Sequence, residues 1–313
     1  MTKSTDSRIV LYPQLGAYVD LWFSRLAGHG LGNCFYCYFH AIVLAEQANG
    51  IVIAPPWFSL KLGPLLRGES SKRLYWRMFK PFANEISGFG KLFRLLAGFP
   101  RRNVVEVGME ATPVLRPGVL NVVVVSTFTF NGLHSYLDLI RRRLLGIIRD
   151  PIPVNFAWGR GSYIAVHVRL GDFAKVGDAT VVSSGQPNTR IPLSWYVSVV
   201  SALRQRFAER EIYIFSDGQP DELRPLLTLG AQLYRSGSDI TDLLAMSGAS
   251  ILVGSNSTYS RWAAFLGDMP SIWLKKTVED EKPTGSETPI LFVGMDDSHP
   301  ELWPQHALRD QPR

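Results

Sequence analysis

YIAVHVRLGD, residues 163–172, starts as an unbroken apolar run and ends in a charged, polar turn. The same half of the chain has three further apolar runs, IYIFS at 212–216, SILVG at 250–254 and SIWL at 271–274. Segments with helical periodicity separate these runs, at 192–207, 220–229, 239–246 and 258–266. Apolar strands that alternate with helices are typical of a parallel sheet covered on both faces. We therefore expect an α/β domain over residues 156–313.

The amino-terminal half has a less regular pattern of the same kind. GHGLGN at 28–33 is a glycine-rich turn, and helical spacing follows it before a short apolar run, IVIA, at 51–54. We predict a buried strand over 121–129 and a helix over 133–149, whose basic end suits the negative end of the helix dipole. Because Pro151, Pro153 and Gly159 form a linker, we divide the chain into domains at 1–155 and 156–313.

The segment 55–118 is an irregular, basic and aromatic insert in the first domain. Ten Lys or Arg residues and only two Glu lie between residues 61 and 102, which accounts for the excess of 33 basic over 27 acidic residues in the chain. One interpretation is that residues 55–105 contact anionic lipid head groups at a membrane surface. The alternative is a solvated basic face whose aromatic side chains belong to the core.

The overall composition limits the class of protein. With 46% hydrophobic and 19% charged residues, the chain can bury a full core and is globular. We find no secretory signal and no apolar run near the roughly 18 residues of a membrane span, so we expect a cytoplasmic protein, with peripheral contact at the inner membrane face as one interpretation. A pI near 9.3 keeps a nucleic-acid-binding protein as an alternative, although no RNA- or DNA-binding motif occurs.

Cys34 and Cys37 are the only cysteines, and their spacing places them on one face of a helix. They could form a redox pair, but no second pair or histidine cluster completes a metal site. Small, buried hydrophobic side chains are the favoured interpretation.

His167, Arg169 and Asp172 lie where the first apolar strand passes into a polar loop. The guanidinium of Arg169 offers a fork of donors that suits a diphosphate, and it stays charged at physiological pH. The alternative is a structural ion pair between Arg169 and Asp172. Either interpretation places a fixed charge at the edge of the predicted sheet.

Two further polar turns follow strands of the same sheet. Ser216 and Asp217 end IYIFS, where they could also be a plain turn before the next helix. Asn256, Ser257 and Thr258 precede a helix whose first turn offers backbone N–H groups to a phosphate, although Ser257 or Thr258 could be a simple N-cap. Because the carboxyl ends of parallel strands share one edge, these turns are expected near Arg169.

Asp239 and Asp242 lie three residues apart before LLAMS, at the start of a predicted helix. Either carboxylate could bind a guanine or ribose edge. Acidic residues in a first helical turn are also ordinary partners of the helix dipole, which is the favoured interpretation from spacing alone.

These motifs in this order resemble the α1,2-fucosyltransferase family. HVRLGD at 167–172, YIFSDG at 213–218 and DLLAMSGASILVGSNSTYSRWAAFLG at 242–267 are similar to the family's HVRRGD, its strand ending in FSDD and its DLxLMSxCxxxIxANSTFSWWGAWL segment. GLGN at 30–33 and FNGLHSYLDLIRRRL at 130–144 are similar to its GLGNQxFQYA and GxFQSxKYFxxIRxxL. The resemblance covers most of the chain, with about 55–118 unmatched.

The resemblance implies a GT-B-like α/β enzyme in which two Rossmann-type domains with parallel sheets face a cleft. The first domain would bind the acceptor and the second the donor, GDP-fucose, with no metal or other cofactor. The expected activity is that of an inverting glycosyltransferase of the galactoside 2-α-L-fucosyltransferase kind. Its acceptor would be a glycan or lipid-linked oligosaccharide in surface polysaccharide or glycolipid synthesis.

The resemblance also assigns roles to residues. Arg169 would hold the β-phosphate and stabilise the leaving diphosphate, with support from His167. The remaining donor-binding positions would be Ser216, Asn256, Ser257 and Thr258 around the diphosphate, Asp239 or Asp242 nearer the nucleoside, and Gly32 and Asn33 from the other domain. Asp172 and Asp178 follow the arginine in the same polar loop and are the candidates for a catalytic general base. The choice between them stays open, and the alternative for Asp172 is that it braces the loop.

The sequence departs from the family pattern at several positions. Cys34 replaces a family Gln, Gly218 replaces an Asp, and Arg261 stands in the tryptophan-rich segment. The donor could therefore be another sugar nucleotide of a GT-B enzyme. The alternative of a different class is a basic nucleic-acid-binding protein or a non-enzymatic nucleotide-binding protein.

Overall fold

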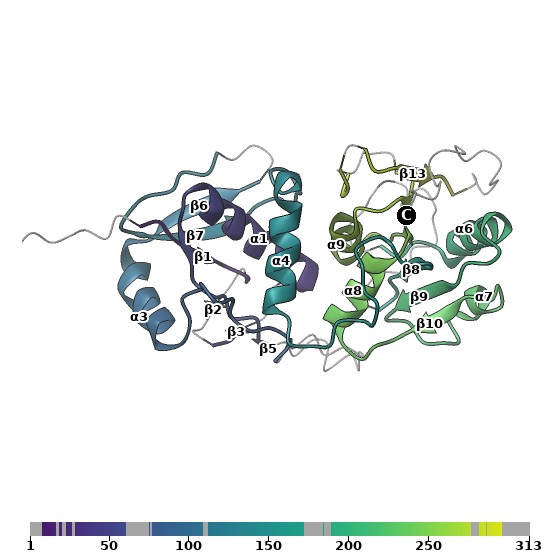
Figure 1. The fold of residues 1–313 in the computed structure, drawn as a ribbon, viewed down its shortest axis with the longest axis horizontal. Coiled ribbons are helices and arrows are strands. Elements are labelled where there is room, and N and C mark those ends of the chain that lie inside the picture. The colour runs from purple at the N-terminus through teal and green to yellow at the C-terminus, as the bar shows by residue number, and fades with distance from the viewer. Residues whose placement is uncertain are drawn as a thin grey trace, which may run out of the picture. The chain divides into compact units, whose positions relative to one another are not determined.

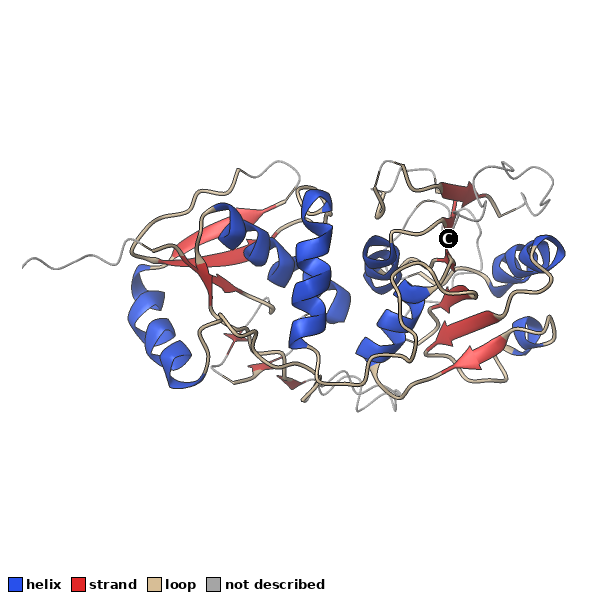
Figure 2. Cartoon of the chain, viewed as in Figure 1, coloured by secondary structure: helices blue, strands red, loops and turns tan. Residues whose placement is uncertain are grey.

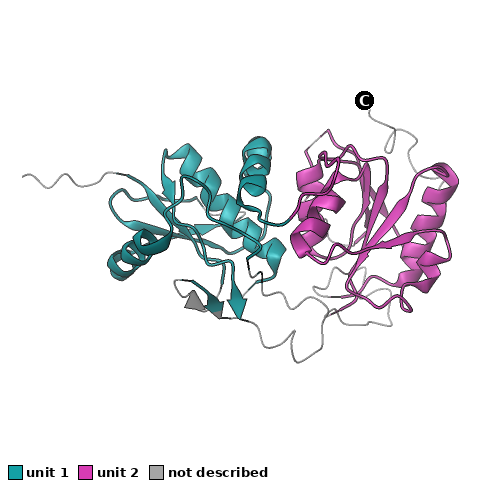
Figure 3. Ribbon diagram, turned by 60° about the horizontal axis from the view of Figure 1, so that its bottom comes forward, with its two compact units in different colours: residues 1–68, 72–150 teal, residues 69–71, 151–313 magenta. Residues whose placement is uncertain are grey.

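The computed structural model describes residues 8–16, 19–20, 23–26, 29–60, 75, 77–108, 112–171, 184, 189–276, 282–285 and 287–295. The described residues up to Asp150 form one compact unit, the first unit, and those from Pro151 onward form the second unit (Figure 3). In both units strands alternate with helices along the chain (Figure 2). Among the described residues, no helix combines the length and the apolar character that a membrane crossing needs.

The first unit is built on a four-stranded parallel sheet in the order β4-β1-β7-β6. Its strands are β1 (Val10–Pro13), β4 (Ile51–Val52), β6 (Asn103–Val107) and β7 (Leu120–Val125). Helices α1 (Leu31–Gln47) and α4 (Leu137–Ile147) cover one face of this sheet, and α3 (Gly88–Gly98) covers the other (Figure 1). A small three-stranded sheet lies beside it, made of β2 (Val19–Asp20), β3 (Arg25–Leu26) and β5 (Ser59–Leu60). The short 3₁₀ turns are η1 (Phe99–Arg101) and η2 (His134–Tyr136).

The second unit contains a six-stranded, all-parallel sheet in the order β10-β9-β8-β11-β12-β13. Its strands are β8 (Ile164–Val168), β9 (Ile212–Ser216), β10 (Gln232–Tyr234), β11 (Ile251–Val253), β12 (Ser271–Leu274) and β13 (Ile290–Val293). Numbered along the unit, this order is 3-2-1-4-5-6, the order of the Rossmann fold. Helices α6 (Leu193–Arg206) and α7 (Arg224–Leu227) cover one face, and α8 (Asp239–Gly248) and α9 (Thr258–Gly267) cover the other (Figure 1).

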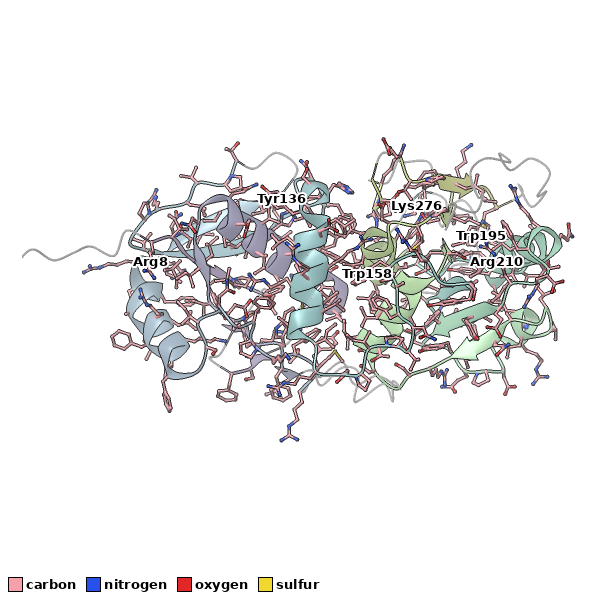
Figure 4. The ribbon with its side chains drawn as sticks, viewed as in Figure 1. Arg8, Tyr136, Trp158, Trp195, Arg210 and Lys276 are labelled. Carbon is pink, nitrogen blue, oxygen red and sulfur yellow. The ribbon has the colours of Figure 1, made fainter. Side chains whose placement is uncertain are left out.

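The core of the second unit explains why its central strands are mainly apolar. Every residue of β8 and β11 is buried, because helices pack on both faces of the sheet. Trp195 points from α6 into this core (Figure 4) and donates a hydrogen bond from Nε1 to the carbonyl oxygen of Val293 at 3.2 Å. The predicted α/β class, with two Rossmann-type units of parallel sheet, is therefore confirmed.

The structure corrects several predicted elements. The helix predicted over 133–149 is a 3₁₀ turn followed by α4, which ends at Ile147 with no basic residue in its last turn. The helix predicted over 220–229 is reduced to α7, after a run of turns. Seven strands were not predicted, namely β1, β2, β3, β5, β6, β10 and β13. Cys34 and Cys37 are both buried in α1 as free cysteines, as the favoured interpretation held.

A glycine at the end of β11 gives the first prediction. A Cβ atom on Gly254 would lie 2.2 Å from Cζ3 of Trp273, so Gly254→Ala forces the tryptophan ring to move. We expect the substitution to lower the free energy of unfolding by about 1–3 kcal/mol, measured by chemical denaturation.

Gly90→Ala is the matched control, because its new Cβ would meet nothing closer than 3.6 Å. This control should leave stability unchanged or raise it by up to about 1 kcal/mol, since alanine favours the helix. Equal losses in both variants would contradict the packing argument.

Candidate functional site

The order of strands in the second unit identifies one edge of its sheet as the candidate site. Strand order reverses between β8 and β11, which lie side by side with Val166 opposite Val253. In open parallel sheets of this kind, ligands bind at the carboxyl ends of the strands beside such a reversal. Arg169 directly follows β8, Asp217 follows β9, and Gly254 follows β11. The structure thus brings the three polar turns of the sequence to the same edge.

Arg169 and Asp217 form an ion pair across this edge. Nη1 of Arg169 lies 2.8 Å from Oδ2 of Asp217, and both side chains are about one-fifth exposed, at 21% and 19%. The other carboxylate oxygen, Oδ1, accepts a hydrogen bond from the backbone N–H of Leu170 at 2.8 Å. The partner of Arg169 that the structure shows is therefore Asp217 from the FSDG turn. Asp172, which the sequence suggested, lies outside the described residues.

The electrostatics of Asp217 keep it ionised. Burial alone would raise its pKa, but the Arg169 charge and the backbone N–H groups of Leu170 and Gly171 outweigh burial and hold the pKa below its ordinary value. An ionised Asp217 fixes the guanidinium of Arg169 at this edge of the sheet. Sequence reasoning treated Asp217 as a turn residue. Its position at the end of the neighbouring strand is the signal that could have identified it.

Two glycines allow the loops after β8 and β9 to meet. A Cβ on Gly171 would lie 2.4 Å from Oδ2 of Asp217, and one on Gly218 would lie 2.4 Å from Cδ1 of Leu170. Ser216 closes the second loop, because its Oγ accepts a hydrogen bond from the N–H of Gly218 at 3.0 Å. Gly218, which replaces an Asp of the family pattern, is thus explained by close packing against Leu170.

Two further arginines bind the same pair of loops. Nη2 of Arg190 donates to the carbonyl oxygen of Gly171 at 3.3 Å, and Nη2 of Arg235 donates to that of Gly218 at 2.5 Å. Nη1 of Arg190 also lies 3.7 Å from Oε1 of Glu222. Sequence reasoning did not single out either arginine. With Arg169 they make this edge of the sheet rich in guanidinium groups.

His167 lies beneath the loop that follows β11. Its side chain is buried, and its Nδ1 lies 2.8 Å from Oγ of Ser255. The centres of the His167 and Tyr259 rings lie 5.5 Å apart. Burial, helped by the nearby Arg169 charge, lowers the pKa of His167 to about 3. The imidazole is therefore neutral at physiological pH. These contacts support a positioning role for His167, which holds the loop after β11, rather than a role in proton transfer.

The loop from Gly254 to Ser257 is held rigidly against the start of α9. Oγ of Ser257 caps the helix by accepting a hydrogen bond from the N–H of Tyr259 at 3.2 Å. The N–H of Ser255 donates to Oγ of Ser260 at 3.2 Å, and that hydroxyl also contacts the carbonyl oxygen of Ser257 at 3.1 Å. The N-cap interpretation of Ser257 is therefore confirmed. Capping is compatible with anion binding, because a helix start leaves other backbone N–H groups available.

Asn256 lies in the middle of this loop and differs from its neighbours. Its Nδ2 atom is buried and makes no hydrogen bond to any described residue. Thr258 follows as the first residue of α9. A buried amide donor without an acceptor is costly, so Asn256 favours a ligand that supplies an oxygen at this point.

Asp239 and Asp242 lie in the first turn of α8, as predicted. Oδ1 of Asp242 accepts a hydrogen bond from the N–H of Ser236 at 2.9 Å, and burial raises the pKa of Asp242. The hydroxyl of Tyr259 donates to the carbonyl oxygen of Asp239, which ties α8 to α9. Asp242 thus organises the turn before α8, and its role toward a nucleoside stays a prediction.

Gly32 and Asn33 lie in the first turn of α1, within the first unit. Near them is a residue that sequence reasoning missed, the fully buried Arg25. Its Nη1 donates to the carbonyl oxygens of Leu15 and His29, each at 3.2 Å, and so shapes the turn before α1. The contribution of Gly32 and Asn33 to a donor site stays a prediction.

Comparisons with known proteins give only distant similarity. No protein-family model matches the chain, and no curated protein matches it. Among solved structures, NodZ α-1,6-fucosyltransferase soaked with GDP-fucose is similar over 88% of this chain and 99% of its own, at 14% identity and a TM-score of 0.45. NodZ from Bradyrhizobium gives 12% identity, 85% and 94% coverage, and a TM-score of 0.40.

A second kind of enzyme is also similar to this chain. Escherichia coli heptosyltransferase WaaC with ADP-2-deoxy-2-fluoro heptose gives 14% identity and a TM-score of 0.32, over 51% of this chain. The similarity spans 43% of the heptosyltransferase chain. Because all these similarities are low, they do not establish the function of this chain.

The ion pair gives the second prediction. Asp217→Asn removes the charge that faces Arg169 while keeping an acceptor for the N–H of Leu170. At pH 7 we expect the free energy of unfolding to fall by about 1.5–3 kcal/mol. The pKa of Asp217 is lowered in the folded state, so its contribution exists above the unfolded-state value near 3.9 and is lost as the pH falls through the folded-state value. The gap between wild type and variant, measured by chemical denaturation, should therefore narrow below about pH 4.

Asp221→Asn is the control for this experiment. Asp221 pairs with Arg224 at 2.6 Å on the surface, where both side chains are largely exposed. Exposed pairs contribute little, so the loss should stay below about 1 kcal/mol. A loss at Asp217 no larger than at Asp221 would contradict the structural importance of the Arg169 pair.

The buried histidine gives the third prediction. Between about pH 6 and pH 4 the unfolded chain binds a proton on His167 that the folded chain does not bind, since its folded-state pKa is about 3. The free energy of unfolding should therefore fall with decreasing pH, with up to about 1.4 kcal/mol per pH unit due to His167 alone. His167→Asn should remove that part of the dependence of stability on pH. The control, His134→Asn, replaces an exposed histidine and should retain it. Parallel slopes in wild type and His167→Asn would show that His167 does not stay neutral.

Proposed function

We propose that this protein is an inverting glycosyltransferase that binds a sugar-nucleoside diphosphate at the carboxyl ends of β8, β9 and β11. The observation that carries the proposal is the position of Arg169. Asp217 fixes its guanidinium beside the loop that precedes α9. This arrangement lies where the strand order of a Rossmann-type sheet reverses, which is where such sheets bind nucleotides. The motifs shared with the α1,2-fucosyltransferase family support the same conclusion.

The site offers three kinds of donor to a diphosphate. The guanidinium of Arg169 carries a planar fork of N–H groups of the kind that binds phosphate oxygens. The N-terminus of α9 provides backbone N–H groups and the positive end of a helix dipole. The amide of Asn256 has a buried donor that a phosphate oxygen would satisfy. Ser216 and Ser257 close the two loops around these groups through their hydroxyl oxygens.

The proposed reaction is a displacement at the anomeric carbon. An acceptor hydroxyl forms the new C–O bond as the bond to the diphosphate breaks, and the electron pair of that bond leaves with the diphosphate. Arg169 and the start of α9 stabilise the charge that develops on the leaving group. Removing one preorganised donor of this kind raises a barrier by about 2.7–4 kcal/mol.

The acceptor proton requires a base, and Asp217 is unsuited to that role. Its carboxylate is engaged by Arg169 and has a lowered pKa, which makes it a weak base. His167 is buried and neutral, and its Nδ1 is engaged by Ser255. Asp172 and Asp178 remain the proposed candidates, and both lie outside the described residues.

We propose GDP-fucose as the donor and a glycan or lipid-linked oligosaccharide as the acceptor, with an α1,2 linkage as the family resemblance suggests. Asp239 or Asp242, at the start of α8, would lie nearer the nucleoside. Neither a metal nor another cofactor is part of the proposal, and within the described part of the chain no group of three His, Cys, Asp or Glu side chains could hold a metal ion. Another sugar nucleotide as donor is the alternative.

Nucleotide binding gives the fourth prediction. GDP, UDP, CDP and ADP, each with and without EDTA, should be compared by thermal shift of the whole chain. We expect GDP to stabilise the protein selectively, by about 2.7 kcal/mol at one hundred times its Kd, and EDTA to leave this shift intact. Arg169→Ala should abolish the shift because it removes the principal cation of the site. Arg224→Ala, which removes an exposed arginine of the same unit, should retain it.

Each other outcome changes the proposal in a defined way. A selective response to UDP, CDP or ADP would overturn GDP-fucose as the donor while retaining a nucleotide-binding site. A GDP response that Arg169→Ala retains would place the site elsewhere. Binding of GDP without transfer of fucose to any glycan would favour a non-enzymatic nucleotide-binding protein.

A further inference from the structure

Helix α3 exposes a stripe of large apolar side chains. Phe89 is 82% exposed, Phe93 73% and Leu96 69%. Their spacing of four and three residues places them on one face of the helix. Large apolar side chains grouped on one helix face are unusual on a protein surface and indicate an interaction site.

The opposite face of α3 holds the helix on the first unit. Lys91 and Leu95 are buried there, and Leu95 packs in a core cluster with Tyr12 and Val122. A Cβ on Gly98 would lie 2.8 Å from Cβ of Leu120, so the end of α3 lies directly against β7. The inner face therefore fixes the helix on the first unit.

Positive charge surrounds the stripe. Arg94 is exposed on α3 itself, and Arg101 and Arg102 are exposed directly after it. The guanidinium of Arg102 lies 5.3 Å from the centre of the Phe99 ring and donates to the carbonyl oxygen of Phe99 at 3.0 Å. Glu85 and Glu106 are the acidic residues in the described stretch 77–108, which contains Arg77, Lys80, Lys91, Arg94, Arg101 and Arg102.

Other aromatic residues of the basic segment belong to the core. Trp57, Tyr75 and Phe79 are buried, and the rings of Trp57 and Phe79 lie 4.3 Å apart. The interpretation of these aromatics as core residues is therefore confirmed. Within the part of the basic segment that the structure describes, the exposed apolar stripe and its neighbouring arginines lie on α3 and the residues up to Arg102.

We propose that this face, made of Phe89, Phe93, Arg94, Leu96, Arg101 and Arg102, docks the protein on the surface of an anionic lipid bilayer. A helix with an apolar face and flanking cations lies in the plane of a membrane, with its apolar side chains below the head groups. Anionic head groups attract each nearby arginine. A second copy of the chain would bring the same positive charges together, which disfavours self-association through this face. Nucleic acid would match the arginines but not the apolar stripe.

The test measures binding of the whole chain to vesicles by flotation, in the absence of nucleotide. We expect binding to vesicles that contain phosphatidylglycerol and little binding to phosphatidylcholine alone. The apolar variant, Phe89→Gln with Phe93→Gln and Leu96→Gln, should lose binding to the phosphatidylglycerol vesicles. The charge variant, Arg94→Gln with Arg101→Gln and Arg102→Gln, should lose about fivefold in binding for each arginine.

Matched variants control for composition. Val114→Gln with Val154→Gln removes exposed apolar side chains elsewhere, and Arg116→Gln with Arg142→Gln removes exposed arginines elsewhere. Both should bind as wild type does. If the apolar variant fails to fold, hydrogen exchange of the wild-type α3 amides decides the matter, since vesicles should slow it.

Three results would overturn the proposal. One is vesicle binding that survives in the apolar variant or equals that of the controls. Another is a dimer in sedimentation that the apolar variant dissociates, without vesicle binding by wild type. The third is α3 amide exchange that phosphatidylglycerol vesicles leave unchanged. Donor binding plays no part in these measurements, so their outcome is independent of the proposed transferase activity.

Discussion

The site depends on the ion pair between Arg169 and Asp217. One partner follows β8 and the other follows β9, so the pair exists only because these strands are neighbours in a parallel sheet. Burying either charge alone would cost free energy. The ion pair, together with the hydrogen bond from the N–H of Leu170, offsets that cost. A guanidinium held in this way meets an anionic ligand without having to be ordered first, which is what a metal-independent transfer of a sugar from a diphosphate would need.

The rest of the site is built from contacts that leave little freedom. His167 is neutral and bonded to Ser255, so the loop after β11 is attached to the centre of the sheet. Ser257 and Ser260 secure the same loop at the start of α9. Glycines at 171, 218 and 254 allow backbone and rings to approach where any side chain would collide. Small polar residues and glycines in these motifs therefore serve geometry as much as direct contact.

Sequence patterns predicted much of the second unit because its buried strands are mainly apolar and its helices alternate with them. They failed where burial was incomplete. The edge strands β10 and β13 are only partly buried, so their pattern does not stand out from loops. In the first unit, β1 lies far from its partner β7 in the sequence, and β6, which also pairs with β7, mixes buried and exposed residues. Sequence alone could not show that β7 connects them.

The sequence by itself determined the two-unit α/β class and the polar turns at strand ends, including the turn that holds Arg169, because these follow from local hydrophobic pattern and from the chemistry of single side chains. Only the tertiary structure decided that Arg169 pairs with Asp217, that His167 is buried and neutral, and that α3 exposes its phenylalanines. Each of these depends on which segments become neighbours. Pairing, desolvation and exposure are properties of contacts between residues distant in sequence, and local patterns do not encode them.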